Sequence, residues 1–571
     1  MEMRDFVVRF AGEGGQGVVT SAEGLAQTAT QAGYHALTFA TFPSQILGGP
    51  TWTQARISVN QVLSPGDDVD VLVAFNQEAY DTHYEDVRPE GVIIFNSNEF
   101  ELEGDSRGFG LPVEDLARAT GNNRAANMVI IGALAHLVRM PQEFLEEFVT
   151  QRFSRGREGD EQIIKSNIAA LTSGREHISQ SGLSLGDLAP PVRPEWEQLM
   201  LKGNEAVSLG ALAAGLELYA GYPISPATTI LVFMERNLVG PGKFAYQVSS
   251  EIESITALLG AGFAGKKAMT ATAGPGFSLM SEGLGLGWIA EIPLVVVNVQ
   301  RGGPATGLPT KTEQSDLMAC MYPAHGDVKM PVIAVGTVEE CFVGAIKAIN
   351  WAERYQGPVI LMTEMSLAER VQNIPRPDLS KVQLDQRNVY TGSNGYLRYA
   401  GHELSPMPIP GNPGAYMANG SEHDDFGDTT HLPARHVQMT ERRFGKIKLL
   451  EEDEYESDRT DHAVAFMPWG GSKGPALEAY NELKDQGVDV GWYYTMFLNP
   501  LPPKLLEELK QKELVIVPEL NYQGQFASIL RSQGVNAEAI TQYTGLPFKV
   551  RDLVDRVKQM TGSRKKETVK A

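Results

Sequence analysis

The chain has 571 residues, and at roughly 150 residues per domain this length predicts about three to four domains. Its 49 Lys and Arg residues against 70 Asp and Glu residues give a formal net charge of −21, which argues against nucleic acid or an anionic membrane surface as a partner. The two cysteines are too few for a four-cysteine zinc or iron–sulfur site and for a disulfide framework, and no apolar run approaches a membrane span. We therefore expect a folded, cytoplasmic protein.

The N-terminal part of the chain alternates predicted strands and helices. The predicted strands cover residues 6–12, 69–76 and 91–96, and the predicted helices cover residues 20–32 and 127–138. Continuous apolar strands that alternate with helices are typical of a parallel sheet covered on both faces. Three prolines between Ser184 and Gln198 then predict a linker.

Two more blocks of the same kind follow, separated by a segment rich in proline, glycine, histidine and acidic residues. The predicted elements are a small-residue helix after Leu201, a turn at 222–226, a helix at 251–265, strands at 292–301, 358–366, 490–495 and 514–519, and helices at 474–486, 503–512 and 523–532. The expected fold class is α/β, with three doubly wound, mostly parallel-sheet domains. We place the domains at 1–186, 199–375 and 457–571, a linker at 187–198 and a loop-rich connector at 376–456.

A glycine-rich loop from Gly12 to Gly17 fits the pattern G-x-G-x-x-G between a predicted strand and a predicted helix. Glycines at such a turn let backbone N–H groups approach a phosphate. A NAD site would also need an acidic residue about 20 residues on, and YHALTFATFPSQ has none there. The loop alone leaves three interpretations open: a turn without ligand, a NAD site, or contact with another phosphate-bearing ligand or interface.

The loop sequence GEGGQGV and the downstream FPSQILGGPTWTQARIS resemble the gamma domain of the 2-oxoacid:ferredoxin oxidoreductases. In that family the domain lies against the thiamine domains and helps form the coenzyme A pocket. The resemblance implies that Ser44, Gln45, Gly48 and Gly49 border coenzyme A.

Three longer motifs follow in order within about 100 residues: AGYPISPATT, SSEIESITALLGAGFAGKKAMTATAGPGFSLM and RGGPATGLPTKTEQSDL. Together they closely resemble the pyrimidine-binding domain of the alpha subunit of the same family. The stretches GSEHDDFGDTT and PELNYQGQ extend the resemblance over nearly the whole chain, and the last block resembles the transketolase C-terminal domain. The resemblance implies a bound thiamine diphosphate that Tyr222, Pro223 and Ile224 contact.

A carboxylate is the residue type that thiamine chemistry requires. Thiamine diphosphate reacts as a C2 carbanion, and a carboxylate bonded to the pyrimidine nitrogen N1′ lets N4′ take the C2 proton. Glu251 matches the family glutamate in position. Glu253 is a competitor, but the two side chains would point about 200° apart on a helix, so only one can serve. A plain acidic residue at a helix N-terminus is the alternative interpretation of Glu251.

The acid group of the substrate requires a fixed cation. Arg301 ends an apolar strand, at the sheet edge where α/β proteins bind ligands, and its planar fork matches a carboxylate. By the resemblance, Arg301 holds the C1 carboxylate of a 2-oxo acid, and Thr310 and Ser225 add hydroxyl donors. Ser225 replaces the threonine usual in the family and keeps the hydroxyl. A surface ion pair is the alternative for Arg301, and Lys311 is a candidate for a second, distal carboxylate.

Two parts of a thiamine enzyme are missing from the sequence. There is no GDG motif with a following Asn for Mg²⁺, and the cysteines for a [4Fe–4S] cluster are absent. We therefore expect a beta subunit that supplies the Mg²⁺, the diphosphate site and the cluster, in an (alpha–beta)2 heterotetramer that reduces ferredoxin.

The fused gamma–alpha layout most resembles the 2-oxoglutarate type, which forms succinyl-CoA, while pyruvate and branched-chain 2-oxo acids stay open. A NAD-dependent dehydrogenase and a non-catalytic scaffold subunit are the alternatives from other classes. The histidines add no metal site to this hypothesis. His423 and its neighbours Asp424 and Asp425 lack the spacing of metal ligands, and we expect them to lie in a solvated or interface loop. We expect His325 to be a histidine packed within its loop.

Overall fold

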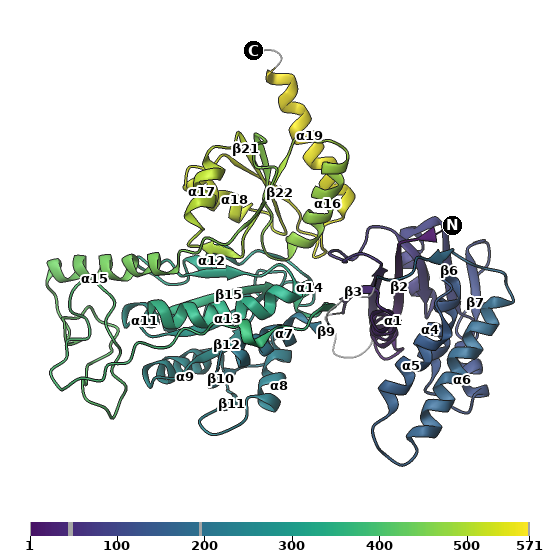
Figure 1. The fold of residues 1–571 in the computed structure, drawn as a ribbon, viewed down its shortest axis with the longest axis horizontal. Coiled ribbons are helices and arrows are strands. Elements are labelled where there is room, and N and C mark those ends of the chain that lie inside the picture. The colour runs from purple at the N-terminus through teal and green to yellow at the C-terminus, as the bar shows by residue number, and fades with distance from the viewer. Residues whose placement is uncertain (1, 44–48, 193–196, 569–571) are drawn as a thin grey trace. The chain divides into compact units, whose positions relative to one another are not determined.

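The computed structural model describes residues 2–43, 49–192 and 197–568. The chain forms two compact units (Figure 1). Unit 1 comprises Met1–Leu201 and Arg370–Arg376, and unit 2 comprises Lys202–Glu369 and Pro377–Ala571. The predicted α/β class is confirmed, since each unit is built on a sheet with parallel strands and packed helices. The division into three domains stays a prediction, because one compact unit can hold two of them.

Unit 1 is built on an eight-stranded sheet. In sheet order its strands are β7 (Gly108–Leu111), β6 (Val87–Asn96), β5 (Val69–Ala74), β2 (Asp5–Glu13), β4 (Pro50–Ser58), β3 (His35–Thr41), β16 (Val371–Pro375) and β9 (Gln198–Lys202). Strands β2, β5, β6 and β7 are parallel, as predicted from their apolar runs. The pairs β2–β4, β4–β3 and β3–β16 are antiparallel. Their sequences mix small, polar and apolar residues, which gave no strand signal.

The described helices of unit 1 pack against this sheet or against one another. They are α1 (Val18–Ala32), α2 (Gln77–His83), α3 (Val113–Ala119), α4 (Ala126–Leu137), α5 (Gln142–Phe153) and α6 (Asp160–Ser179). The backbones of α4 and α6 touch at two glycines, because a Cβ on Gly132 would meet the carbonyl of Leu171 and a Cβ on Gly174 would meet that of Val129. A short pairing of β1 (Glu2–Met3) with β8 (Asp187–Leu188) completes the unit.

Strand β16 belongs to unit 1, although in the sequence it follows residues 202–369 of unit 2. Asn373 accepts a hydrogen bond from the Ala36 N–H through Oδ1 at 2.8 Å, and the Gln372 Nε2 donates to the Val62 carbonyl at 3.1 Å. Both side chains are buried. The strand is therefore part of the unit 1 sheet, although the sequence analysis placed its residues in the middle domain.

Unit 2 contains a seven-stranded sheet that carries the motifs of the middle block. In sheet order its strands are β11 (Phe244–Gln247), β10 (Leu218–Gly221), β12 (Ala268–Thr272), β13 (Leu294–Gln300), β15 (Pro358–Glu364), β14 (Val332–Ala334) and β20 (Phe497–Asn499). The first six strands are parallel and β20 is antiparallel. Every residue of β13 is buried, as its apolar run predicted.

Helices cover both faces of this sheet. They are α7 (Gly203–Ala213), α8 (Thr228–Asn237), α9 (Glu251–Phe263), α10 (Gly274–Leu279), α11 (Ser281–Ile289), α12 (Leu317–Met321), α13 (Val338–Tyr355) and α14 (Met365–Ala368). Val296 shares a core with residues of α9 and α11, whereas Leu361 lies against Gly344 of α13. The described helices include none long and apolar enough to cross a membrane.

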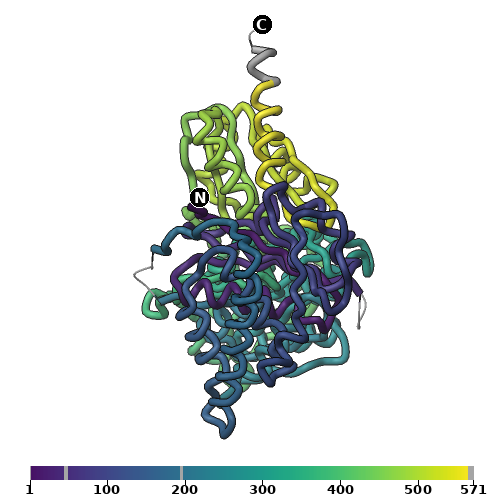
Figure 2. The backbone as a smooth tube through the Cα atoms, turned by 90° about the vertical axis from the view of Figure 1, so that its right-hand side faces the viewer, coloured from purple at the N-terminus to yellow at the C-terminus, as the bar shows by residue number. Residues whose placement is uncertain are grey.

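The C-terminal block of unit 2 has its own five-stranded sheet. In sheet order its strands are β17 (Glu456–Asp458), β19 (Gly491–Tyr494), β18 (Val464–Phe466), β21 (Leu514–Glu519) and β22 (Ala537–Thr541), and its helices are α16 (Lys473–Asp485), α17 (Pro503–Lys510), α18 (Gln525–Ser532) and α19 (Val550–Thr568). Val515, Val517 and Phe526 belong to the same core cluster as Val296 and Met362 of the larger sheet. This shared core joins the predicted middle and last blocks. Helix α19 extends from the block in both views (Figures 1 and 2).

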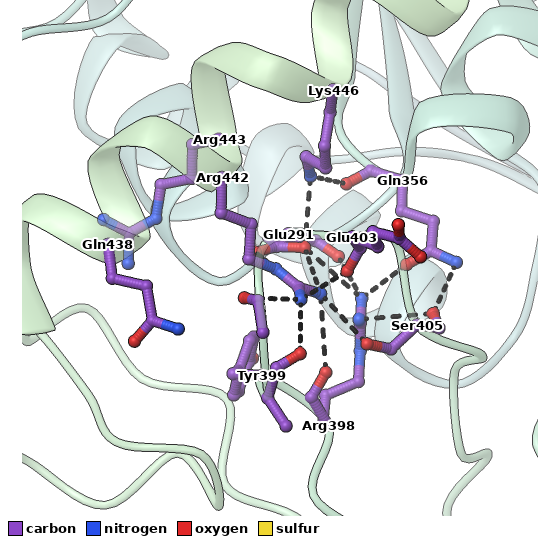
Figure 3. A network of polar contacts seen from close by, with 12 residues as sticks. Glu291, Gln356, Arg398, Tyr399, Glu403, Ser405, Gln438, Arg442, Arg443 and Lys446 are labelled. Carbon is purple, nitrogen blue, oxygen red and sulfur yellow. Dashed lines mark hydrogen bonds and ion pairs between the residues drawn. The ribbon is translucent and has the colours of Figure 1, made fainter.

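The connector is rich in loops, as predicted, and it also contains α15 (Pro433–Gly445). A buried ion cluster fixes it to the middle block (Figure 3). The Glu291 carboxylate lies 2.8 Å from Arg442 Nε, 3.2 Å from Lys446 Nζ and 3.9 Å from an Arg398 nitrogen. Burial alone would raise the pKa of Glu291, but the three cations outweigh burial and hold that pKa below its usual range. Charge pairing therefore anchors the connector.

Candidate functional site

Four neighbouring parallel strands of unit 2 end at one edge of the sheet, and a predicted site motif follows each of them. Glu251 follows β11, the turn Tyr222–Pro226 follows β10, the turn Gly274–Gly276 follows β12, and Arg301 follows β13. The carboxyl edge of a parallel sheet is where α/β proteins bind ligands. We call these residues, together with Asp316, the strand-end site.

Glu251 is the first residue of α9, and its side chain is only 6% exposed. Among the described residues, none makes a hydrogen bond or ion pair with its carboxylate. A buried carboxylate without a partner is costly unless a ligand supplies one. The structure therefore places at position 251 an acid whose bonding a ring nitrogen of a bound cofactor could complete.

Glu253 has a different role in the same helix turn. Its Oε2 accepts hydrogen bonds from the backbone N–H of Ser249 at 2.8 Å and from the Ser249 hydroxyl at 2.6 Å, which lower the pKa of Glu253. Its own N–H donates to the Ser250 hydroxyl at 3.2 Å. Glu253 thus caps the helix on the exposed side, while Glu251 is buried.

The turn Gly274–Gly276 passes between two carboxylates. A Cβ on Gly274 would lie 2.8 Å from Asp316 Oδ2, and a Cβ on Gly276 would lie 2.7 Å from Glu251 Cγ and closer still to its Oε1. Any side chain at either position would displace an acidic group. The motif TAGPG marked this turn in the sequence, but only the fold shows which carboxylates it touches.

Arg301 connects the turn after β10 to the end of β13. Its Nη1 donates to the Ser225 carbonyl at 2.7 Å, while its buried Nε has no hydrogen-bond partner among the described residues. Burial lowers the pKa of Arg301, and the nearby Asp316 carboxylate opposes that shift. The guanidinium is therefore fixed at one nitrogen and has another nitrogen available for an anionic ligand.

Asp316 and Asn298 belong to the site, although the sequence analysis did not single them out. Asn298 Nδ2 donates to Asp316 Oδ2 at 3.1 Å and to Cys320 Sγ at 3.2 Å. Burial raises the pKa of Asp316, while the hydrogen bond from Asn298 and the charge of Arg301 oppose that shift. Two features of the sequence could have pointed to these residues: the aspartate inside TEQSDL, and the asparagine that interrupts the apolar run of β13.

Thr310 and Lys311 lie on the loop that begins after Arg301. The loop closes on itself, since the Gly302 N–H donates to the Lys311 carbonyl at 3.0 Å and the Leu308 N–H donates to the Gly302 carbonyl at 2.9 Å. Thr310 and Lys311 are half-buried, and burial lowers the pKa of Lys311. We call residues 302–312 the substrate loop.

The glycine-rich loop of unit 1 folds over one of its own side chains. Gln16 Oε1 accepts hydrogen bonds from the Glu13 N–H at 2.7 Å and from Asn76 Nδ2 at 3.4 Å. Strand β2, which leads into the loop, pairs with the antiparallel β4, so the strand order differs from that of a dinucleotide-binding βαβ unit. This topology speaks against the NAD interpretation.

Gly49 is the part of the predicted coenzyme A border that the structure describes. Its carbonyl accepts a hydrogen bond from the Gly14 N–H at 3.4 Å, so the two glycine-rich segments lie together in unit 1. Ser44, Gln45 and Gly48 lie outside the described residues.

The prediction of a packed His325 is wrong, and the prediction of a solvated or interface loop agrees with the exposed Asp424 but not with His423. His423 is fully buried and its ring lies 4.1 Å from that of Tyr399, because the connector folds around this pair. The His325 side chain is 87% exposed and lies 3.6 Å from Glu282. In the ranges that the structure describes, no group of three or more His, Cys, Asp or Glu side chains is arranged to hold a metal ion.

Comparisons with known proteins agree with this geometry. The family described as "Pyruvate flavodoxin/ferredoxin oxidoreductase, thiamine diP-bdg" matches residues 209–442, and "Pyruvate ferredoxin/flavodoxin oxidoreductase" matches residues 7–177. The first match contains the whole strand-end site. The second contains the glycine-rich loop.

Relatives cover nearly the whole chain. The alpha subunit of 2-oxoacid:ferredoxin oxidoreductase 2 from Aeropyrum pernix is 30% identical, over 97% of this chain and 98% of that protein. The 2-oxoglutarate oxidoreductase subunit KorA of Mycobacterium tuberculosis is 31% identical, over 96% of this chain and 90% of that protein. A solved structure of 2-oxoglutarate:ferredoxin oxidoreductase from Magnetococcus marinus, with 2-oxoglutarate, coenzyme A and succinyl-CoA bound, is 35% identical, has a TM-score of 0.92 and covers 98% of this chain and 100% of that chain. The chain therefore belongs to the 2-oxoacid:ferredoxin oxidoreductases, as an alpha-type subunit of a multi-subunit enzyme.

Proposed function

We propose that the chain is the alpha subunit of a thiamine-dependent 2-oxoglutarate:ferredoxin oxidoreductase. The enzyme converts 2-oxoglutarate and coenzyme A to succinyl-CoA and CO₂, with the two electrons passing to ferredoxin, or runs the reverse carboxylation. The observation that carries this proposal is the buried, unpaired Glu251 carboxylate on the same sheet edge as Arg301.

Glu251 is the residue that would hold the pyrimidine ring of thiamine diphosphate. Its carboxyl group would hydrogen-bond N1′ of the ring and share one proton with it, which would favour the tautomer in which N4′ is basic. When bound, thiamine diphosphate supplies the C2 carbanion that attacks the 2-oxo carbon. The turn after β10, with Tyr222, Pro223 and Ile224, borders the ring, and Gly274 and Gly276 leave space beside it.

Arg301 is the residue that would hold the substrate. Its unpartnered Nε offers a charge-assisted hydrogen bond to the C1 carboxylate, while the Ser225 carbonyl keeps the guanidinium in place. The hydroxyls of Ser225 and Thr310 are the neutral donors. The choice of 2-oxoglutarate is supported by the substrate named for the relatives from Mycobacterium tuberculosis and Magnetococcus marinus. Pyruvate and branched-chain 2-oxo acids are the alternatives that a substrate panel distinguishes.

A beta subunit would complete the site with the diphosphate pocket, Mg²⁺ and a [4Fe–4S] cluster, in an (alpha–beta)2 assembly in the cytoplasm. The apolar side chains of Ile252 and Leu279, 55% and 53% exposed, belong to the two helices that contribute Glu251 and Gly276, which supports a protein partner there. In unit 1, the segment of Ser44, Gln45, Gly48 and Gly49 is the proposed border of coenzyme A.

The decisive experiment compares two glutamates of one helix turn in the enzyme assembled with its beta subunit. Glu251→Gln keeps the shape and removes the charge, so we expect the rate of 2-oxoglutarate-dependent ferredoxin reduction to fall at least 100-fold. Glu253→Gln alters only the exposed cap and should keep the rate within threefold. A wild-type rate for Glu251→Gln would refute the thiamine role of this acid.

A second substitution tests the substrate role. Arg301→Lys replaces a planar fork with a point charge, and we expect kcat/KM for 2-oxoglutarate to fall by about 5- to 150-fold, equivalent to about 1–3 kcal/mol. The KM for coenzyme A should stay unchanged. An unaltered kcat/KM for 2-oxoglutarate would contradict the proposed contact.

A further inference from the structure

The segment that begins at the last residue of the substrate loop runs between the two sheets of unit 2. We call residues 312–318 the return segment. On one side it is bonded to the end of β13, since the Asp316 N–H donates to Gln300 Oε1 at 3.2 Å. On the other side it is bonded to the C-terminal block, whose motif PELNYQGQ has no role in the proposed chemistry.

Gln314 makes most of the hydrogen bonds between the return segment and the C-terminal block. It is fully buried, and its Nε2 donates to the Trp469 carbonyl at 2.8 Å while its Oε1 accepts from the Leu520 N–H at 3.0 Å. Its own backbone N–H donates to the Leu520 carbonyl at 2.8 Å, and its carbonyl accepts from Asn521 Nδ2 at 3.0 Å. Both ends of the side chain and both backbone groups therefore bond to the C-terminal block.

The neighbours of Gln314 are attached in the same way. Gln525 bonds the return segment twice, because its Nε2 donates to the Ser315 carbonyl at 2.7 Å and its Oε1 accepts from the Met318 N–H at 2.9 Å. The Thr312 N–H donates to the Gly545 carbonyl at 3.2 Å. The return segment is thus bonded along its length rather than at one point.

A buried acid keeps the partner groups in place. Glu519 accepts hydrogen bonds from Trp469 Nε1 at 3.2 Å, Asn521 Nδ2 at 2.9 Å, and the backbone N–H groups of Phe526 and Ala527, both at 2.9 Å. Trp469 and Asn521 bond Gln314 directly, and Phe526 and Ala527 follow Gln525, which bonds Ser315. The C-terminal block therefore offers a preformed surface to the return segment.

We propose that Gln314 is a positioning residue for the substrate-binding groups, and this inference rests on the proposed role of Arg301. Arg301 lies between Gln300, whose side chain bonds the return segment, and Gly302, whose N–H donates to Lys311 at the end of the substrate loop. Holding the return segment against the C-terminal block fixes both ends of the loop that carries Thr310. The motif PELNYQGQ then serves substrate binding without touching the substrate.

The test uses the enzyme assembled with its beta subunit and compares two buried glutamines of unit 2. In Gln314→Ala we expect the KM for 2-oxoglutarate to rise about 5- to 20-fold, with kcat within threefold and an unchanged KM for coenzyme A. Gln356→Ala is the matched control, because Gln356 is equally buried and bonds Arg398 and Ser405 in the connector cluster. It should lower the melting temperature and leave the KM for 2-oxoglutarate unchanged.

The outcomes separate this inference from the proposed function. If Arg301→Ala raises the KM for 2-oxoglutarate and Gln314→Ala does not, the positioning role is refuted and the proposed function stands. If Arg301→Ala itself has no effect, the proposed function fails first. If both raise KM, the double variant should exceed Arg301→Ala by less than twofold, and full additivity would overturn the inference.

If Gln314→Ala does not assemble with the beta subunit, Gln314→Glu replaces it in the same KM measurements, with the same expected rise in the KM for 2-oxoglutarate. This variant keeps the acceptor for the Leu520 N–H and loses the amide donor to the Trp469 carbonyl.

Discussion

Gly276 and Glu251 lie so close that any side chain at position 276 must move the carboxylate. On the proposed role of Glu251, Gly276→Ala should therefore lower kcat at least tenfold, because the misplaced carboxylate would no longer meet the pyrimidine nitrogen. Gly260→Ala is the control on helix α9, since a Cβ there meets nothing within 4 Å and the change favours the helix. Steady-state rates of the assembled enzyme check both. Equal rates for the two variants would contradict the close contact.

At this scale the sequence predicted the residue types but not their partners. Glu251 and Arg301 could be named because their motifs resemble those of the family, whereas their residue types alone left a helix-terminal acid and a surface ion pair open. Asp316 could not, because its neighbours Asn298 and Gly274 come from other strand ends and meet it only in the fold. His423 was misjudged for a similar reason, since the aromatic ring that covers it lies outside its own motif.

The connector depends on ionised Glu422. Burial would raise the pKa of Glu422, but hydrogen bonds from Arg443 at 2.7 Å and His436 at 2.6 Å outweigh burial and lower that pKa to about 2. Because the pKa of Glu422 is lower in the folded than in the unfolded chain, its ionised carboxylate stabilises the fold at pH values above the unfolded pKa of about 4.5. This stabilisation is lost as the pH falls toward the folded pKa of about 2.

Glu422→Gln should therefore cost about 1–2 kcal/mol at pH 7, and the difference from the wild type should shrink between about pH 5 and pH 3. Thermal unfolding across that range measures the effect. Glu282→Gln is the control, because Glu282 is exposed. A difference from the wild type that does not change with pH would rule out the charge as its cause.

The crossing of α4 and α6 has no space for a methyl group. Gly132→Ala would place Cβ against the Leu171 carbonyl, so we expect a loss of about 1–3 kcal/mol despite the better helix propensity of alanine. In Gly24→Ala on α1 the new Cβ would lie 3.0 Å from the end of the Ile131 side chain, which can turn away, and at ordinary contact distance from the Phe148 ring. The melting temperature of the purified chain should fall for the first variant only.

Elements with one strong periodic signal were predicted well. The apolar runs of β5, β13 and β21 and the pattern of α16 needed no tertiary information. Strands β3 and β4 were missed because small and polar residues interrupt their apolar positions. Helix α15 was missed because it buries three arginines rather than an apolar stripe, and Glu291, the partner of Arg442, lies in another segment.

A truncation that follows the boundaries of the two units should keep the remaining part folded, and one that cuts across them should not. Deleting residues 1–186 would leave β9 and β16 without the rest of their sheet, so we expect that variant to aggregate. Deleting 1–201 and replacing 370–376 with a flexible linker removes unit 1 as a whole, and unit 2 should then stay soluble with the beta subunit. It should release CO₂ from 2-oxoglutarate without any stimulation by coenzyme A. Full stimulation would contradict the proposed coenzyme A role of unit 1.

The position of β16 in the chain has a consequence for biosynthesis. Its neighbour in the sheet, β3, leaves the ribosome about 330 residues earlier, which at about 5–20 residues per second means a delay of roughly 15 to 65 seconds. Throughout that interval the edge of β3 opposite β4 lacks its partner strand and leaves backbone amide and carbonyl groups unpaired. We therefore expect the nascent chain to be prone to aggregation until residue 375 has emerged, and slower translation to lengthen that period.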